Sequence, residues 1–236
     1  TGAKVYQNEI SKYNNFQMAR KIQLNSLYGA MANQYFRFYD DRIAEGITMS
    51  GQLIIRDTAK ALDAYMNKVC GTEKEMYSFY SDTDSCYITC KTLVDNFFPD
   101  KSTEKVVGLL DQIGTDKIEP AIANAMRKLG NYTNAFEHKI DFKREVIADK
   151  GIFVAKKRYA LNVLDDEGLR LKEPKLKVMG LEIVRSSTPA PIRDSLKEAV
   201  RLILTSDEDT LQDYILQTQT DFKKFTPEEI AFPRGC

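Results

Sequence analysis

Two carboxylates stand two residues apart, at Asp82 and Asp84, within a stretch that runs from Tyr77 to Thr89. Aromatic and β-branched residues on both sides favour short strands, and the Asp, Thr and Ser between them favour a turn. The sequence therefore predicts a hairpin with both acids at its tip. Carboxylates this close repel each other unless a cation or a shared proton compensates, and oxygen ligands at this spacing suit a hard divalent ion such as Mg²⁺. The stretch indicates a metal site whose ion would bind a substrate phosphate.

Other interpretations use the same residue types. Asp, Ser and Thr are common in ordinary Asx turns, and this stretch alone leaves that alternative open. An EF-hand loop agrees less well with the sequence, because it needs a Gly and a distal Glu where Cys86, Tyr87 and Ile88 continue as an apolar strand. Motifs elsewhere in the chain must decide between an ordinary turn and a metal site.

The composition is that of a globular protein without a strong charge. The chain has 236 residues, of which 43% are hydrophobic and 10% aromatic, and this supplies enough apolar material for a core. Lys plus Arg and Asp plus Glu both count 34, so any nucleic-acid site must be a local basic patch. With one histidine and no C-x-x-C pair, a structural zinc site is disfavoured, and we expect reduced thiols in a cytoplasmic protein.

The chain shows no sign of export or membrane insertion. No run approaches the about 18 consecutive apolar residues that a membrane helix needs. The chain begins without Met, and Thr226-Pro227-Glu228-Glu229 opens a helix just before its last residues. Both ends therefore predict a fragment of a longer protein.

A helix is predicted from Asn14 to Met31. Lys21, Asn25 and Tyr28 are spaced by four and three, so they share one stripe that presents a cation, an amide and an aromatic ring. Small and partly apolar residues occupy the other side. A solvated polar face is the alternative for these three residues, and spacing alone does not decide between the two.

The remaining pattern predicts an α+β fold. The run from Tyr35 to Asp40 indicates a strand or its approach. Helices are predicted from Ile47 to Val69, from Thr103 to Ile113, and from Ile118 to Leu129 with Gly130 as its stop. Alternation begins at Lys139 and continues to Val146, and strands follow from Phe153 to Val163 and from Leu169 to Val178. Two further helices begin at Thr188, as a cap, and at Asp207, with a domain boundary near Leu181.

A basic run lies within the predicted antiparallel sheet. Lys156-Lys157-Arg158-Tyr159 places three cations in a row on a strand, so both faces carry charge. Such a strand suits contact with phosphates. A solvated edge strand protected by lysines is the alternative, and the run alone leaves both open.

Three motifs follow one another along the chain: Lys21-x-x-x-Asn25-Ser26-x-Tyr28-Gly29, then Tyr80-Ser81-Asp82-Thr83-Asp84-Ser85, then Lys156-Lys157-Arg158-Tyr159. In this order they resemble the successive motifs of the family B DNA polymerases, in particular the replicative polymerases of T-even-like bacteriophages. The runs from Glu173 to Glu182 and from Ser186 to Pro189 are also similar to that group. The resemblance extends from about Tyr13 to about Leu204, and it replaces the blander interpretations above.

The resemblance implies a fold and a division of the chain. The α+β fold would be a polymerase palm with an antiparallel sheet and packed helices, a fingers helix and the first thumb helices. Residues 1–33 would be the C-terminal part of the fingers, residues 34–180 the palm, and residues 181–236 the start of the thumb.

The resemblance also implies a reaction and its site. The parent protein would be a DNA-directed DNA polymerase that transfers deoxynucleotides to a primer 3′-hydroxyl with two Mg²⁺ ions. Asp84 and a carboxylate from an earlier motif would bind metal, with Asp82 close by and Glu145 in a secondary role. The nucleotide-binding residues would be Lys21, Asn25 and Tyr28. The residues on primer-template DNA would be Lys156, Lys157, Arg158 and Tyr159.

The chain departs from the family pattern at its amino end. The first palm motif, Asp-x-x-Ser-Leu-Tyr-Pro, does not occur in these residues, because Ser26-Leu27-Tyr28 is followed by Gly29. The resemblance therefore implies that the chain alone is inactive. The partners that it implies are primer-template DNA, deoxynucleoside triphosphates and a sliding clamp bound through a region absent here, in the cytoplasm of a phage host.

Two rival functions share parts of this pattern. A catalytically dead nucleic-acid-binding module would keep the fold and the basic run, but the intact Asp82 and Asp84 argue against it. The second rival is the palm of a reverse transcriptase or RNA polymerase, in which the two acids are typically adjacent. Thr83 stands between Asp82 and Asp84 here and disfavours that assignment.

Overall fold

The computed structural model of the chain describes residues 2–232, with side chains from residue 6 onward. Two compact units divide it, Thr1–Asp57 and Thr58–Cys236. The boundary falls within one long helix, α2 (Asp41–Cys70), so each unit contains part of it.

The first unit consists of α1 (Gly2–Met31), a connection over residues 32–40 and the beginning of α2. The helix predicted from residue 14 is confirmed, and it begins much earlier. The expected packing face on α1 is not covered, since Ala19, Ile22 and Ser26 are all exposed. Its apolar residues are spread around the helix instead of gathered on one stripe, and so they define no core face.

The strand expected over residues 35–40 is wrong. The segment forms consecutive turns, in which the N–H of Phe36 donates to the carbonyl of Asn33 at 2.9 Å and the N–H of Tyr39 to that of Phe36 at 3.0 Å. Aromatic residues favour a strand only where a partner strand accepts their backbone, and none pairs with this segment in the described chain. The carboxylate of Asp40 then accepts the N–H of Arg42 at 3.0 Å, which explains why α2 begins at Asp41 instead of residue 47.

Helices and a hairpin open the second unit. After α2 come β1 (Ser78–Asp82) and β2 (Ser85–Ile88), which form an antiparallel hairpin, and then α3 (Lys91–Phe97) and α4 (Thr103–Ile113). The end of α2 packs on α3 and α4 through a buried cluster. Its fully buried members are Met66, Tyr77 and Leu93.

A π-helical turn, η1 (Gly114–Ile118), leads into α5 (Glu119–Tyr132). The stop predicted at Gly130 is wrong, because the helix continues through it to Tyr132. Asn134 takes the left-handed conformation instead, with φ of 53°. Asparagine tolerates that conformation at the end of a helix nearly as glycine does. Asn134, two residues after Tyr132, therefore takes the role that was expected of Gly130.

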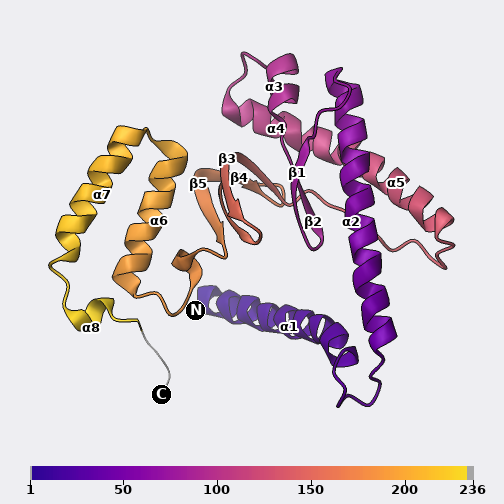
Figure 1. Ribbon diagram of the computed structural model, residues 1–236, viewed down its shortest axis with the longest axis horizontal. Coiled ribbons are helices and arrows are strands. Elements are labelled where there is room, and N and C mark those ends of the chain that lie inside the picture. The colour runs from indigo at the N-terminus through magenta and orange to yellow at the C-terminus, as the bar shows by residue number, and fades with distance from the viewer. Residues whose placement is uncertain (1, 233–236) are drawn as a thin grey trace. The chain divides into compact units, whose positions relative to one another are not determined.

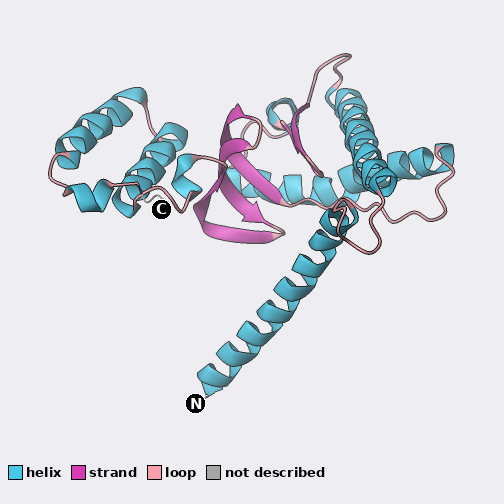
Figure 2. Ribbon diagram, turned by 60° about the horizontal axis from the view of Figure 1, so that its bottom comes forward, coloured by secondary structure: helices cyan, strands magenta, loops and turns pink. Residues whose placement is uncertain are grey.

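The three-stranded antiparallel sheet has the order β3 (Val146–Ala155), β4 (Arg158–Asp166), β5 (Leu169–Met179) (Figure 2). The strand expected over residues 153–163 is therefore two strands with a turn at residues 156–157. The alternation expected from residue 139 is also wrong before Val146.

Polar contacts to helices explain why residues 139–145 form no strand. The guanidinium of Arg144 lies 2.6 Å from the carboxylate of Asp111 on α4 and 2.5 Å from the buried carboxylate of Asp165 on β4. The side chain of Lys143 pairs with Glu119 on α5 at 3.2 Å. These ion pairs hold the segment against α4 and α5 instead of in the sheet.

Helices follow the sheet, of which the first packs on the sheet and the next two pack on that first helix (Figure 1). A 3-10 turn, η2 (Glu182–Val184), precedes α6 (Ala190–Thr205), α7 (Glu208–Phe222) and α8 (Pro227–Ile230). A second buried cluster joins α6 to the sheet through Ala160, Leu181 and Leu204.

A helix cap at Thr188 and a helix beginning at Asp207 were predicted in this region. Thr188 does not cap α6, because its hydroxyl donates to the carbonyl of Glu182 at 2.8 Å and Pro189 takes the cap position. Asp207 does cap α7, since its carboxylate accepts the N–H of Thr210 at 2.9 Å.

The predicted α+β class is confirmed, with helices around two antiparallel sheets. Among the helices of residues 2–232, none combines the length and the apolarity that crossing a bilayer requires.

Candidate active site

The two acids predicted at the tip of a hairpin are found there. Asp82 ends β1, and a turn of Thr83 and Asp84 joins it to β2. The N–H of Asp84 and the hydroxyl of Ser85 both donate to the carbonyl of Asp82, at 2.7 and 3.0 Å. Thr83 has φ of 56°, which is an outlier for a β-branched residue and costs on the order of 1–3 kcal/mol. The tip therefore has one tightly specified conformation that the surrounding structure must maintain.

An ammonium group lies on the first of these acids. The Nζ of Lys157 is 2.6 Å from Oδ1 of Asp82 and 3.1 Å from the hydroxyl of Thr83, and that hydroxyl in turn donates to Asp82 at 3.0 Å. The Asp82 side chain is 16% exposed and the Lys157 side chain 59% exposed. The hydrogen bond from Lys157 lowers the pKa of Asp82 although its partial burial acts in the opposite direction, and the same bond raises the pKa of Lys157. Both groups are charged at neutral pH.

The basic run is a turn followed by a strand, which corrects the expected single strand. Lys156 and Lys157 join β3 to β4, and Lys157 has φ of 60°, a conformation that no extended strand contains. The backbone N–H of Lys157 donates to the hydroxyl of Tyr80 on β1 at 2.7 Å. The structure thus brings two of the sequence motifs together, the carboxylate hairpin and the lysine turn.

The other two residues of that run point elsewhere. The guanidinium of Arg158 reaches both carboxylate oxygens of Glu182 at 2.8 Å. Tyr159 is only 4% exposed, and its hydroxyl lies 2.7 Å from that of Tyr87. Burial raises the pKa of Tyr159, so the phenol stays neutral. Tyr159 supports the turn from inside the fold, and Arg158 supports it through a partly exposed ion pair.

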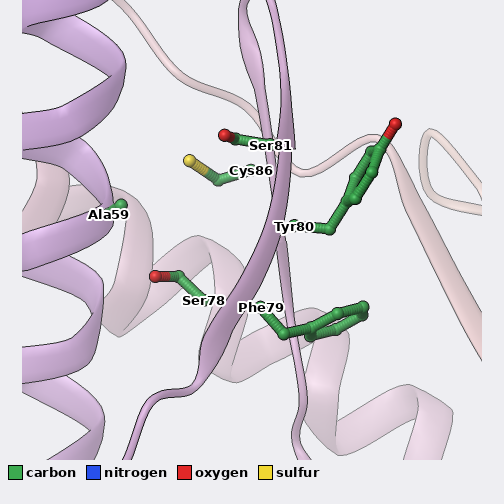
Figure 3. Close-up of a pocket in the computed structure, with 6 residues that line it drawn as sticks. All are labelled: Ala59, Ser78, Phe79, Tyr80, Ser81 and Cys86. Atoms are coloured by element: carbon green, nitrogen blue, oxygen red, sulfur yellow. The ribbon is translucent and has the colours of Figure 1, made fainter. Parts of the chain in front are cut away.

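An aromatic cluster fixes the hairpin on the three-stranded sheet. The rings of Tyr80 and Phe153 are 4.7 Å apart, those of Tyr87 and Tyr159 5.4 Å, and those of Phe153 and Tyr159 5.3 Å and stacked. A register shift between Ser78 and Tyr80 inserts an extra residue into β1. As Figure 3 shows, Phe79 and Tyr80 consequently point away from α2, whereas Ser78 and Ser81 point toward it.

The other side of the hairpin is held by a carboxylate that the sequence analysis did not single out. Oδ1 of Asp63 on α2 accepts the N–H groups of Tyr77 at 3.0 Å and Ser78 at 2.7 Å, and its other oxygen accepts the hydroxyl of Ser78 at 3.1 Å. One turn further on, the amide of Asn67 bonds both the N–H and the carbonyl of Glu75, at 2.9 and 2.8 Å. The spacing of Asp63 and Asn67 by four is the only sequence signal for this role.

A small cavity beside the hairpin does not account for substrate binding. Its volume is about 110 Å³, well below the roughly 300 Å³ at which ligand pockets begin. It is lined by Ala59, Ser78, Phe79, Tyr80, Ser81 and Cys86 (Figure 3).

The donor set at the tip suits a hard cation. Asp82 and Asp84 supply carboxylate oxygens, and the ammonium of Lys157 already occupies a cation position against one of them. Glu145, the third predicted ligand, pairs instead with Lys177 on β5 at 2.8 Å. Within residues 2–232 no three His, Cys, Asp or Glu side chains gather to hold a metal. The tip therefore offers two carboxylates, Asp82 and Asp84, as the side chains that could ligate a divalent metal.

The predicted nucleotide-binding residues lie in the first unit. Lys21, Asn25 and Tyr28 all belong to α1 and are exposed, with Tyr28 at 41%. The predicted stripe is thus present on a helix and accessible to solvent.

Comparison with known proteins bears on the same motifs. The family model for "DNA polymerase family B" matches residues 4–97, and the model for "Divergent Family B DNA polymerase" matches residues 73–218. The DNA-directed DNA polymerase of Enterobacteria phage T4 is 40% identical over 228 residues, which are 92% of this chain and 25% of that protein. The corresponding enzyme of Escherichia phage RB69 is 43% identical over 202 residues, 81% of this chain and 22% of that protein.

More distant relatives include DNA polymerase II of Escherichia coli strain K12, which is 27% identical over 207 residues, 85% of this chain and 23% of that protein. The chain spans about a quarter of the length of these three relatives. The two family models together run from residue 4 to residue 218, and both describe the same family. The chain belongs to the family B DNA polymerases.

Proposed function

We propose that this chain supplies the nucleotidyl-transfer site of a template-directed DNA polymerase, which adds deoxynucleotides to a primer 3′-hydroxyl. The observation that carries the proposal is the tip of the β1–β2 hairpin, where Asp82 and Asp84 meet the lysine turn of the three-stranded sheet. Family membership supports it, as do the phage relatives, which are named DNA-directed DNA polymerases.

Asp84 and Asp82 would hold Mg²⁺, because carboxylate oxygens are the ligands this ion prefers. Two such ions, when bound, would activate the primer hydroxyl and stabilise the charge of the triphosphate and pyrophosphate. The chain's own residues keep the acids in position: the carbonyl of Asp82 accepts two hydrogen bonds across the turn, and the aromatic cluster anchors both strands below it.

The exposed stripe on α1 would bind the incoming nucleotide. Lys21 offers a compact positive charge for the triphosphate, while Asn25 and Tyr28 offer an amide and a ring for sugar and base. Lys156 and Lys157 lie in an exposed turn that suits contact with the phosphates of primer-template DNA. Arg158 and Tyr159 would serve DNA binding through the turn that they support. A sliding clamp would be a further partner of the parent protein.

The test is primer extension by the purified chain with Mg²⁺ and four deoxynucleotides, alone and with a polypeptide that carries the Asp-x-x-Ser-Leu-Tyr-Pro motif. We expect no extension by the chain alone, because these 236 residues lack that motif's carboxylate and cannot hold two ions about 3.5–4 Å apart. Template-dependent extension should appear when the motif is supplied. Duplex binding without extension in any combination would favour a DNA-binding module and contradict the proposal.

A further inference from the structure

A groove is lined by one face of α4 and by Arg170 on β5. Its volume is about 490 Å³, within the roughly 300–1,000 Å³ that ligand pockets occupy. Its α4 residues are spaced by three or four and so share one stripe of the helix: Lys105, Gly108, Leu109 and Gln112. The groove therefore follows the axis of α4.

The acid in the lining of the groove is already neutralised. The carboxylate of Asp111 pairs with the guanidinium of Arg144 at 2.6 Å and with that of Arg170 at 3.1 Å. Both guanidinium groups also pair with the fully buried carboxylate of Asp165. Two acids and two arginines thus balance one another, and this cluster gives the groove a rigid wall without net charge.

Two lysines of the groove have no such partner. Lys101 lies just before α4 and Lys105 in its first turn, and both are exposed. No carboxylate on a side chain that the structure describes pairs with either, and the neighbouring acids Asp100 and Glu104 do not line the groove. The groove therefore has a positive end. A compact ammonium on a flexible stem suits a phosphate as a point charge.

Beyond the lysines the groove becomes apolar and then polar again. Gly108 leaves its floor without a side chain, and a Cβ there would meet only the Nη2 of Arg170, at 3.9 Å. Half-buried Leu109 continues the floor, and the exposed amide of Gln112 ends it. Lys105 and Gln112 are seven residues apart, which is about 10 Å along a helix. The order of cation, apolar floor and amide suits the phosphate, sugar and base of one nucleotide.

The groove is separate from the hairpin tip. Arg170 pairs with Asp165 near the end of β4, whereas Lys157 directly precedes Arg158, with which the same strand begins. The seven residues from Arg158 to Asp165 advance by roughly 20 Å along a strand. A small ligand in the groove therefore does not reach the acids of the tip.

We propose that this groove is a second site for a nucleoside phosphate, additional to the site of the proposed polymerase function and independent of it. The phosphates bind to Lys101 and Lys105, and the sugar and base lie over Gly108 and Leu109. A free nucleotide and a single-stranded oligonucleotide share this chemistry, so the experiment includes both.

The test is two-dimensional amide NMR of the isotope-labelled chain in EDTA, during titration with dATP, with inorganic tripolyphosphate or with a single-stranded tetramer of deoxyadenylate. The amide of Gln112 reports on the groove, and that of Gly29, beside Tyr28, reports on the stripe of α1. We expect saturable shifts at Gln112 with dATP or with the tetramer, and the tighter of the two identifies the source. No saturable shift there with either would overturn the proposal. Because the two reporters are independent, either site can fail alone.

The charged end is tested by removing one lysine. We expect Lys105→Met to weaken dATP binding at Gln112 about two- to fivefold, the range for an exposed ion pair. Lys197→Met, which removes an exposed lysine on α6, should leave it unchanged. Equal effects of the two variants would mean that the chain attracts anions only through its general charge, and would overturn the proposal.

The apolar floor is tested by filling it. Gly108→Leu keeps both lysines and adds a good helix former, so thermal unfolding should show α4 intact. We expect this variant to weaken dATP binding about fivefold or more, because the base loses its apolar surface, and to change tripolyphosphate binding less than about twofold. Equal changes for the two ligands would show an anion patch without nucleoside recognition, and would contradict the proposal.

Discussion

The hydroxyl of Tyr80 accepts the backbone N–H of Lys157 at 2.7 Å, which ties the carboxylate hairpin to the turn between β3 and β4. The two residues are 77 positions apart in the chain. The same lysine forms the ion pair with Asp82, so the backbone bond to Tyr80 helps to set the geometry of the tip.

Tyr80→Phe should remove this bond and leave the aromatic packing intact. We expect a loss of about 0.5–1.5 kcal/mol in the free energy of unfolding, the usual contribution of one hydrogen bond. Urea denaturation measures it, with Tyr35→Phe as the control, since that side chain is exposed in the first unit. A loss no larger than that of the control would mean that the bond does not support the tip.

Gly180→Ala should be strongly destabilising. Gly180 has φ of 64°, and an added Cβ would clash with the carbonyl of Lys157, so the chain must either strain or move the lysine turn. We expect a cost of more than about 1 kcal/mol. Gly51→Ala is the matched control within α2, where a Cβ meets nothing within 4 Å and should stabilise the helix by about 0.5–1 kcal/mol. Equal thermal stabilities of the two variants would contradict this account of Gly180.

Asp63→Ala should loosen the base of the hairpin. It would leave the N–H groups of Tyr77 and Ser78 without their acceptor, and each unsatisfied buried donor costs about 1–3 kcal/mol. Hydrogen exchange at these two amides should become faster, while an exposed acidic position such as Asp213→Ala should leave it unchanged. Unaltered exchange rates in Asp63→Ala would show that α2 does not hold β1 through this carboxylate.

The ion pair at the tip should give stability a defined pH dependence. The pKa of Asp82 lies below its ordinary value of 3.8, so its contribution is present above that value and is lost as the pH falls through the lowered pKa. The pKa of Lys157 lies above 10.5, so its contribution is present below that value and is lost as the pH rises further.

The difference in unfolding midpoint between the wild type and Asp82→Asn should therefore be flat from about pH 5 to about pH 9 and shrink in acid. Urea denaturation at a series of pH values measures it. In the Lys157→Met background the difference should be smaller throughout the flat range. A difference that grows as the pH falls below about 4 would have the wrong sign for a carboxylate with a lowered pKa.

Local patterns were sufficient to predict much of the fold. The helix expected over residues 103–113 coincides with α4. Residues close together in the sequence determine both its apolar spacing and its ends, so a local pattern was sufficient. The turn of Asp82 to Ser85 was also predictable, since its residue types form turns in many contexts. The extra residue in β1 was not, because the bulge exists to place Tyr80 on the sheet, and that depends on the distant ring of Phe153.

The lysine turn, residues 156–157, shows most clearly what local sequence patterns cannot predict. The basic run that contains it was expected on one strand, and the turn at Lys157 arises from contacts with Tyr80 and Gly180 that no short window contains. The same reason explains Asp63, which looks like any polar residue on the exposed side of a helix. The place of Asp82 and Asp84 at a hairpin tip was predictable from sequence, whereas the groups that position them were found only through tertiary structure.

The central claim is that the tip of the β1–β2 hairpin performs the chemistry. The most direct measurement is single-turnover incorporation of a deoxynucleotide by the chain supplied with the missing carboxylate motif, compared between the wild type and Asp84→Ala, with duplex affinity measured in parallel. We expect Asp84→Ala to lower the rate by about a hundredfold or more, because it removes charge stabilisation at the reacting phosphate, and to leave duplex affinity nearly intact. A rate within about tenfold of the wild type would contradict the claim.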